Sequence, residues 1–282
     1  MADAPIGVFD SGLGGLTVAR AMLRALPRER IVYLGDTARV PYGTRSAETV
    51  IRYARGCARV LIEREVKALV IACNTVSAVA LELLRAELDL PVLGVVEPGA
   101  RTAVRTLEGL VHAHASEAPP KVGVLGTNGT IASGAYPRAV AQISTRVEVV
   151  GQAAPLLVPL VEEGWIEGEV PRLAVRRYLE PLIAAGAGVI VLGCTHYPLL
   201  KSLIAEVAAK LAGRAIPVVD SAEATAAAVC AAIDEQRISA STVLPAEPLE
   251  LLVTDLPASF ALVASTFLGG ETPPVQQIDL RA

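Results

Sequence analysis

The sequence predicts an α/β fold in which two similar, doubly wound parallel-sheet domains are related by pseudo-twofold symmetry, with the active site in the cleft between them. Two observations lead to this expectation. Short runs of Val, Ile and Leu alternate with longer helical stretches, which is the pattern of parallel βα units. In addition, the chain repeats its own pattern at roughly half its length, as a duplicated domain would.

The expected strands are short, apolar and flanked by helical segments. Between them lie stretches with helical spacing, such as residues 46–65, where charges gather on one side and Ser46 can cap the first turn. This alternation defines the α/β class. The runs that we assign to strands are 6–9, 31–34, 68–72, 92–96, 122–125, 147–150, 189–192 and 216–219.

The internal repeat links the strand ends of one half to those of the other. Three pairs of segments align in the same order: IGVFDSGLGG (6–15) with VGVLGTNGT (122–130), LVIACNT (69–75) with VIVLGCTH (189–196), and LPVLGVVE (90–97) with IPVVDSAE (216–223). Ligands of open α/β sheets bind at the carboxyl-end loops, so these equivalent loops should face each other. The stretch 112–121 between the halves contains Pro119 and Pro120 and is expected to be a surface loop near the domain boundary.

Composition and charge argue against several classes of partner. The 282 residues include 25 Lys and Arg against 29 Asp and Glu, without a basic run, so nucleic acid is not expected as a partner. The first residues show no secretory signal, and polar residues interrupt the longest apolar stretches, so we expect a cytoplasmic protein that does not enter a membrane.

The four cysteines form neither a CxxC pair nor a set with His at metal-ligand spacing, so no metal site and no disulfide framework is expected. Cys57 and Cys230 lie within apolar helical segments and are expected to pack in the core. Cys73 and Cys194 each follow a strand and precede a polar residue. One such cysteine alone would favour a packing role. Two at equivalent positions of the repeat favour a pair of reactive thiols.

Three further polar residues can be interpreted from the sequence alone. Asp10 precedes a glycine-rich segment that fits neither a P-loop nor a dinucleotide motif, so it indicates either a tight turn or backbone amides closing on a small carboxylate. His196 follows Cys194 by two residues, which favours a role in proton handling. Glu162 belongs to an acidic helix end that needs no function to explain it.

Six ordered motifs closely resemble those of bacterial glutamate racemases, and the similarity spans nearly the whole chain. They are FDSGLGGLTV (9–18), GDTARVPYG (35–43), ACNTVSA (72–78), VVEPG (95–99), LGTNGT (125–130) and GCTHYPLL (193–200). The final segment also looks like the closing strand and helix of that family. The resemblance implies one domain of residues 1–98 plus 213–282 and a second of residues 99–212. Two departures, Val76 and Asn128, remove no catalytic group.

The resemblance also implies a role for each reactive residue. Cys73 would deprotonate D-glutamate and Cys194 would deprotonate L-glutamate, each donating in the reverse direction. Asp10 would assist Cys73, whereas His196 would assist Cys194 with Glu162 as its orienting partner. The implied substrate-binding residues are Asp10, Ser11, Pro41, Tyr42, Gly43, Asn74, Thr75, Thr127, Thr130, Thr195 and His196.

The implied reaction is racemisation of glutamate without pyridoxal, metal or any other cofactor, supplying D-glutamate for peptidoglycan synthesis. A homodimer is expected, with its arrangement left open. Two alternatives remain: a racemase for aspartate or another amino acid, and a non-catalytic or moonlighting binding protein, because some glutamate racemases inhibit DNA gyrase. The two intact cysteines argue against a loss of catalysis.

Overall fold

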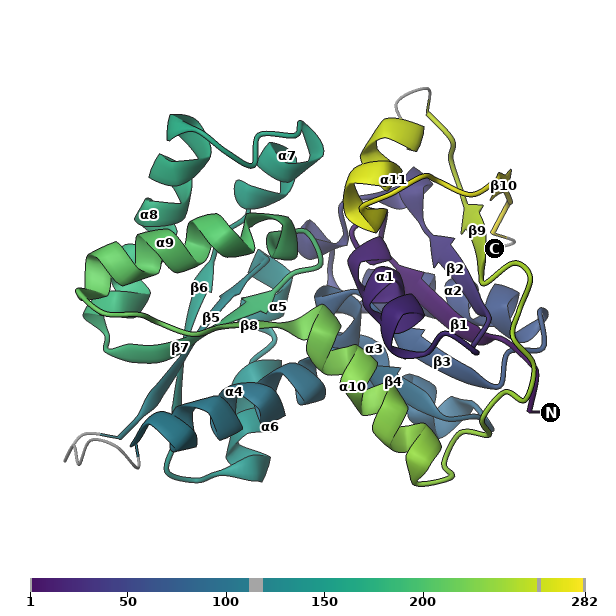
Figure 1. Cartoon of the computed structure of the whole chain (residues 1–282), viewed down its shortest axis with the longest axis horizontal. Coiled ribbons are helices and arrows are strands. Elements are labelled where there is room, and N and C mark those ends of the chain that lie inside the picture. Colours follow the sequence, from purple (N-terminus) through teal and green to yellow (C-terminus); the bar gives the residue numbers. More distant parts are fainter. Residues whose placement is uncertain (1, 112–118, 258–259, 281–282) are drawn as a thin grey trace.

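The computed structural model describes residues 2–111, 119–257 and 260–280. They form two parallel sheets, each covered by helices, that lie side by side (Figure 1). Both chain ends lie on the half that contains the larger sheet. The expected class, two parallel-sheet α/β domains, is confirmed.

The larger sheet has six parallel strands, and its helices cover both faces. In spatial order the strands are β10 (Val275–Gln277), β9 (Leu249–Val253), β2 (Ile31–Gly35), β1 (Ile6–Asp10), β3 (Ala68–Ile71) and β4 (Val92–Gly94). Successive residues of β3 pack in different core clusters, Val70 in one and Ile71 in the other, as expected for a sheet buried on both sides. The associated helices are α1 (Leu16–Ala25), α2 (Ala47–Ile62), α3 (Asn74–Glu87) and α11 (Phe260–Leu268).

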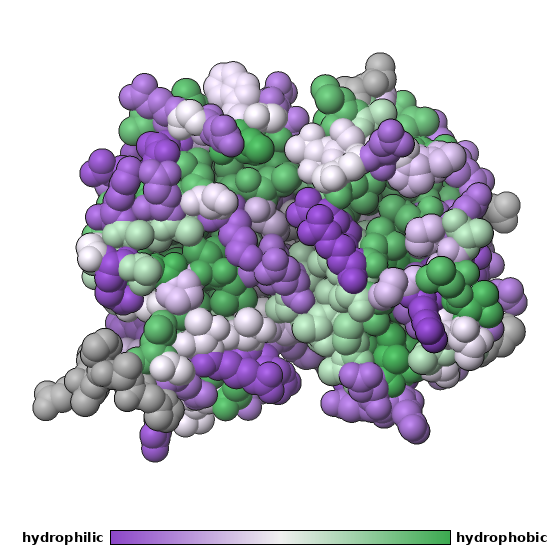
Figure 2. Space-filling view, viewed as in Figure 1, coloured by the Kyte–Doolittle hydropathy of each residue, from purple (hydrophilic) through white to green (hydrophobic). Residues whose placement is uncertain are grey.

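The smaller sheet has four parallel strands, in the order β6 (Glu148–Ala153), β5 (Lys121–Gly126), β7 (Ala187–Gly193) and β8 (Val218–Asp220). Its helices are α4 (Val96–Val111), α5 (Asn128–Ala132), α6 (Ala135–Ile143), α7 (Leu157–Glu162), α8 (Glu169–Ala184) and α9 (Lys201–Ala212). Helix α10 (Ser221–Asp234) follows β8 and packs against α1 of the other half. Its many alanines appear as a pale green area near the middle of Figure 2, while polar side chains are spread over both halves.

The strand orders confirm the internal repeat. The core of the larger sheet runs β2-β1-β3-β4, and the smaller sheet runs β6-β5-β7-β8. In both halves the strands, numbered along the chain within that half, therefore lie in the spatial order 2-1-3-4. The three aligned segment pairs correspond to β1 with β5, β3 with β7 and β4 with β8. Cys73 and Cys194 therefore follow equivalent strands.

All eight expected strands are present, with shifted ends. The run at 92–96 is shortened to β4 because α4 begins at Val96. Strand β10 was not expected; it has three residues at the sheet edge, too few to show an alternating pattern. Residues from 213 onward were assigned to the first domain, yet β8 pairs with β7 in the smaller sheet. Residues 112–118 of the expected loop lie outside the described residues.

Local sequence explains how the helices form. Ser46 caps α2 by accepting a hydrogen bond from the Thr49 amide (3.3 Å), as expected from the sequence. Cys57, on the buried face of the same helix, is fully enclosed, as expected, whereas Cys230 is only partly buried. Among the described residues, no helix is both long and apolar enough to span a membrane.

Candidate active site

One cavity of about 350 Å³ lies between the two sheets and is lined by loops from both halves. The loops follow β1, β2 and β3 on one side and β5, β6 and β7 on the other, which is where open α/β sheets bind ligands. Its lining residues are Ser11, Gly12, Val40, Pro41, Tyr42, Gly43, Thr44, Cys73, Asn74, Thr75, Thr127, Asn128, Pro155, Val158, Pro159, Glu162, Cys194, Thr195 and His196.

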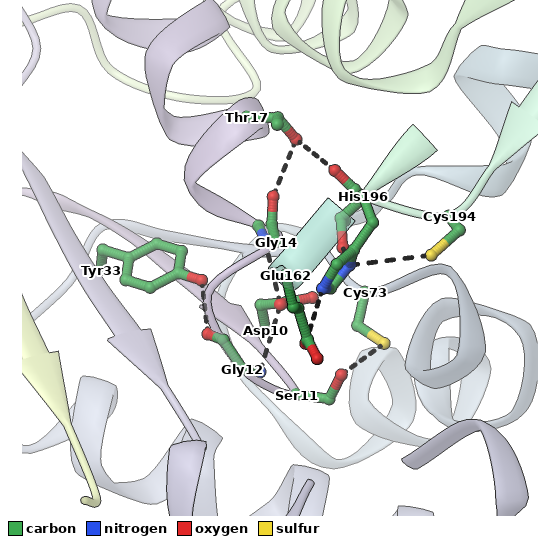
Figure 3. Close-up of polar contacts among 12 residues, drawn as sticks. Asp10, Ser11, Gly12, Gly14, Thr17, Tyr33, Cys73, Glu162, Cys194 and His196 are labelled. Carbon is green, nitrogen blue, oxygen red and sulfur yellow. Dashed lines mark hydrogen bonds and ion pairs between the residues drawn. The ribbon is translucent and has the colours of Figure 1, made fainter. Parts of the chain in front are cut away.

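Cys73 is the residue immediately before α3, so its thiol lies at the amino end of a helix and at the edge of the cavity. The Sγ atom contacts Ser11 Oγ at 3.4 Å (Figure 3). Burial, followed by the negative charge of Asp10, raises the pKa of the Cys73 thiol to about 12. At neutral pH this sulfur therefore carries a proton.

Cys194 follows β7 and is accompanied by a histidine and a glutamate in series. The Cys194 Sγ atom lies 3.9 Å from His196 Nδ1, and His196 Nε2 lies 3.0 Å from Glu162 Oε1 (Figure 3). Although burial opposes the charged imidazole, contacts with Cys194 and Glu162 raise the pKa of His196 to about 10. His196 is thus a cation at neutral pH, beside one thiol of the site.

Asp10 lies beneath the glycine-rich loop, behind the cavity lining. Its Oδ2 accepts hydrogen bonds from the amides of Gly12 (3.2 Å) and Gly15 (3.0 Å). Its Oδ1 is buried and has no hydrogen-bond partner among the described residues. Burial raises the pKa of this carboxyl despite those amides, while the charge of His196 acts in the opposite direction. An acceptor atom is therefore free beside the Cys73 half of the site.

The two halves lie in close contact at Gly14. A Cβ atom on this glycine would lie 2.3 Å from Thr195 Oγ1 and 2.5 Å from His196 Nδ1, so no side chain fits there. Nearby, the Thr17 hydroxyl hydrogen-bonds the carbonyls of Gly14 (2.9 Å) and Thr195 (3.1 Å). Glycine at 14 thus allows the loop after β1 to contact the loop after β7.

Neutral polar groups occupy the other side of the cavity. Thr75 Oγ1 lies 2.9 Å from Thr127 Oγ1 and 3.3 Å from Thr130 Oγ1, which joins α3 to the loop after β5. The Tyr136 hydroxyl donates to Asn74 Oδ1 at 2.8 Å, while Asn74 Nδ2 has no partner among the described residues. These groups are suited to bind carboxylates through hydrogen bonds rather than through ion pairs.

Twelve of the fourteen sequence-predicted site residues line the cavity. The other two, Asp10 and Thr130, lie directly behind the lining and contact it through hydrogen bonds. Seven further lining residues were not among the predicted site residues: Gly12, Val40, Thr44, Asn128, Pro155, Val158 and Pro159. Gly12, Val40 and Asn128 lie within the motifs and Thr44 directly follows one, so for these four the motifs themselves were the available signal.

Asp36 was also missed, although it belongs to the GDTARVPYG motif. It is fully buried, and its carboxylate accepts hydrogen bonds from the Tyr42 hydroxyl, from Arg39 Nε at 2.7 Å and from the Thr254 hydroxyl at 2.9 Å. The loop that carries Pro41 and Tyr42 is thereby fixed against the C-terminal return of the chain. Among the described residues, no three His, Cys, Asp or Glu side chains are grouped as metal ligands.

Comparison with known proteins identifies relatives along the full length of the chain. A family model for Asp/Glu/hydantoin racemases matches residues 6–229. A glutamate racemase of Geobacter metallireducens is 48% identical over 98% of this chain and 97% of its own. Two crystal structures of glutamate racemases are also similar. The RacE1 isoform from Bacillus anthracis is 36% identical with a TM-score of 0.89, and the enzyme from Francisella tularensis, in complex with D-glutamate, is 33% identical with a TM-score of 0.85. Each match covers 99% of both chains. The chain therefore belongs to the Asp/Glu/hydantoin racemase family.

Proposed function

We propose that this protein interconverts L-glutamate and D-glutamate by transferring protons at the α-carbon between Cys73 and Cys194. One observation carries the proposal: two thiols, at equivalent positions of two similar domains, line the same cavity from opposite sheets. Racemisation breaks a C–H bond on one face of a carbon and forms one on the other. It therefore needs a base and an acid on either side, which this arrangement supplies.

Each direction of the reaction uses the two sulfur atoms in opposite protonation states. In one direction the Cys194 thiolate takes the α-proton of L-glutamate, the electron pair stays on the carbon, and the Cys73 thiol donates its proton to the opposite face. The reaction of D-glutamate runs in reverse. The raised pKa of Cys73 leaves the free protein with a thiol there at neutral pH, which is the state that receives L-glutamate.

Each thiol has a different helper. The imidazolium of His196, held by Glu162, stabilises negative charge on the adjacent sulfur of Cys194. Asp10 assists Cys73, because its unpaired Oδ1 can accept a hydrogen bond from the thiol or from the substrate ammonium while the α-proton is transferred. The two enantiomers have equal free energies in water, so the two helpers must support equal values of kcat/KM in the two directions.

The carbanion formed at the α-carbon is stabilised by the surroundings rather than by a cofactor. Hydrogen-bond donors held in a buried site stabilise developing negative charge more strongly than donors in water do. The unpaired Asn74 Nδ2 and the hydroxyls of Thr75 and Thr195 are donors for the substrate carboxylates. The other proposed substrate-binding residues are Ser11, Thr127, Thr130 and, through their backbone, Pro41, Tyr42 and Gly43. The substrate's own ammonium offsets the developing negative charge. We accordingly propose that neither pyridoxal nor metal takes part.

Exchange of the α-proton tests this proposal directly. The protein is freed of metal and pyridoxal and incubated in D₂O with L- or D-glutamate, with L- and D-aspartate as controls, and followed by proton NMR. We expect loss of the α-proton signal with inversion for glutamate only. Exchange that favours aspartate would instead select a racemase for another amino acid, and no exchange would point to a binding protein.

Three broader properties are part of the same proposal. The D-glutamate would supply peptidoglycan synthesis, and the protein would act in the cytoplasm as a homodimer. Sedimentation equilibrium would then give twice the 29.3 kDa of one chain. Complementation of a strain that requires D-glutamate tests the physiological role, and no growth without the supplement would contradict it.

The domain boundaries are proposed from the sheets. One domain would comprise residues 1–98 and the C-terminal return, and the other the segment from residue 99 to the return. We set the return crossing after β8, at Asp220, instead of at residue 213, because β8 pairs with β7. Limited proteolysis that cuts near both crossings would support this division, and cleavage within either sheet would oppose it.

A further inference from the structure

The imidazole of His196 is enclosed by groups from four elements. Thr195 and Cys194 lie on its own loop, Glu162 comes from α7, and the backbone of Gly14 comes from the loop after β1. The buried carboxylate of Asp10 is near enough to interact with its charge. The fourth element is α11, near the C-terminal end of the chain, and its contact with the ring is apolar.

The contact from α11 is made by Phe267. The rings of Phe267 and His196 have centroids 5.1 Å apart and planes inclined at 79°, which is an edge-to-face arrangement in its attractive range. Phe267 is 1% exposed and does not line the cavity. It therefore touches the histidine without being able to touch the substrate.

Helix α11 presents this ring because of its own pattern. Phe260, Ala264 and Phe267 are buried and spaced at four and three residues, so they form one face of the helix, whereas Leu262 is 75% exposed. That buried face packs against α1 of the first domain (Figure 1). The C-terminal return thus brings a rigid ring from one half of the molecule onto a functional side chain of the other half.

His196 can act only if both of its nitrogen atoms keep their directions. Nδ1 must face the sulfur of Cys194 while Nε2 faces Glu162, and these two contacts lie at opposite ends of the ring. The Cys194 contact is long, at 3.9 Å, and Glu162 is about half exposed, so the two polar partners alone restrain the ring weakly. A packed aromatic ring restricts tilting, because protein interiors leave little space for alternative rotamers.

We propose that Phe267 is a positioning residue for racemisation: it holds the His196 imidazole in line between Cys194 and Glu162, and the C-terminal helix thereby completes the active site. The inference rests on the proposed function for its effect on rate. Its structural part, the restraint on the imidazole, stands independently of the substrate.

The kinetic test compares two substitutions in the same helix. Phe267→Leu removes the ring beside His196, and Phe260→Leu removes an equally buried ring that does not contact it. Since a displacement of about 1 Å in an active site can cost roughly a hundred-fold in rate, we expect Phe267→Leu to lower kcat by about ten-fold or more with KM changed less than about three-fold. Phe260→Leu should lose stability alone. Equal kinetic losses in both variants, or none in Phe267→Leu, would overturn the proposal.

The second readout needs no substrate. The chain has three histidines, so the ring ¹⁵N spectrum of histidine-labelled protein is simple, and His196→Asn identifies the signals of His196. We expect these signals to shift or broaden in Phe267→Leu and to stay unchanged in Phe260→Leu. Unchanged signals in Phe267→Leu would refute the positioning role even if no glutamate were racemised, which separates this failure from that of the proposed function. If Phe267→Leu does not fold, Phe267→Met replaces it, because Met keeps most of the volume without the ring.

Discussion

The hydroxyl of Tyr136, on α6 of the second domain, donates a hydrogen bond of 2.8 Å to Asn74 Oδ1, at the start of α3 in the first. This contact crosses the interface between the domains beside Cys73. With its oxygen engaged, the Asn74 amide keeps its nitrogen unpaired among the described residues and available to a ligand. A buried residue outside the cavity lining thus orients Asn74, a proposed substrate-binding residue, within the cavity.

Loss of the Tyr136 hydroxyl should therefore weaken substrate binding. In Tyr136→Phe the amide can rotate, so its hydrogen bond to a charged carboxylate is partly lost. We expect KM to rise by about ten-fold while kcat falls by less than about three-fold, as a lost hydrogen bond to a charged group would require. Steady-state kinetics with both enantiomers measure this. A KM equal to that of the wild type would show that Asn74 is oriented by other means.

Gly14→Ala should inactivate the protein although the change adds a single methyl group. The new Cβ would overlap Thr195 Oγ1 and His196 Nδ1, so the histidine must move away from Cys194. We expect a loss in kcat of roughly a hundred-fold. The matched control is Gly56→Ala, in the middle of α2, where a Cβ meets nothing within 4 Å.

The control should keep full activity and gain about 0.5–1 kcal/mol of stability, because alanine loses less conformational freedom than glycine in a helix. The racemisation rates of Gly14→Ala and Gly56→Ala, measured under the same conditions, test this prediction. Full activity in Gly14→Ala would mean that the domains do not approach each other here during turnover.

The charged state of His196 should appear in the pH dependence of stability. The folded protein raises the pKa of this group from 6.5 to about 10, so it binds the proton more tightly than the unfolded chain does. The resulting stabilisation is complete below pH 6.5 and disappears as the pH rises through about 10. Urea unfolding of the wild type and of His196→Asn, measured across this range, isolates the contribution, since other groups titrate in both proteins.

The difference in unfolding free energy between these two proteins should shrink as the pH increases. Glu162→Gln should lower the folded-state pKa of His196 and move the loss of stability to lower pH, because it removes one of the contacts that favour the imidazolium. A difference that is constant from pH 6.5 to 10 would show that His196 is neutral throughout.

Much of the fold follows from patterns that are local in the sequence. Apolar runs such as those that form β1 and β3 are continuous because both faces of the sheet are covered, and the spacing between the repeats places Cys73 and Cys194 after equivalent strands. The edge strand β10 could not be found this way, because its three residues are mostly exposed. The repeat aligns β8 with β4 and so indicates the smaller sheet, where β8 pairs with β7, although the boundary at residue 213 placed it in the first domain.

The site was predictable where motifs carry chemistry and obscure where it depends on tertiary packing. Cys73, Cys194 and His196 could be chosen because reactive side chains at strand ends have few structural explanations. Tyr136 and Phe267 resemble ordinary core aromatics in the sequence. The role proposed for Tyr136 depends on its contact with Asn74, 62 residues away, and that proposed for Phe267 depends on its contact with His196 in the other domain. Asp36 could be recognised as part of a motif, but its partner Thr254 lies 218 residues away.

The pseudo-symmetry of the scaffold does not extend to the helpers. His196 in the second half corresponds to Thr75 in the first, and Asp10 in the first corresponds to Gly126 in the second, since each pair occupies the same position relative to aligned strands. A duplicated fold thus presents two similar thiols with different charged groups beside them, His196 for Cys194 and Asp10 for Cys73. The pairing of the sulfur atoms, rather than any single helper, is the central feature of the account.

Racemisation by Cys73→Ser and Cys194→Ser tests that feature most directly. Each protein is mixed with one enantiomer of glutamate, optical rotation is followed with time, and Cys230→Ser, the same chemical change on the partly buried face of α10, serves as the control. We expect each of the first two variants to fold and to lose at least about a hundred-fold in rate, as removal of a general acid or base does, with the control unaffected. Turnover like that of the wild type in either Cys73→Ser or Cys194→Ser would contradict it.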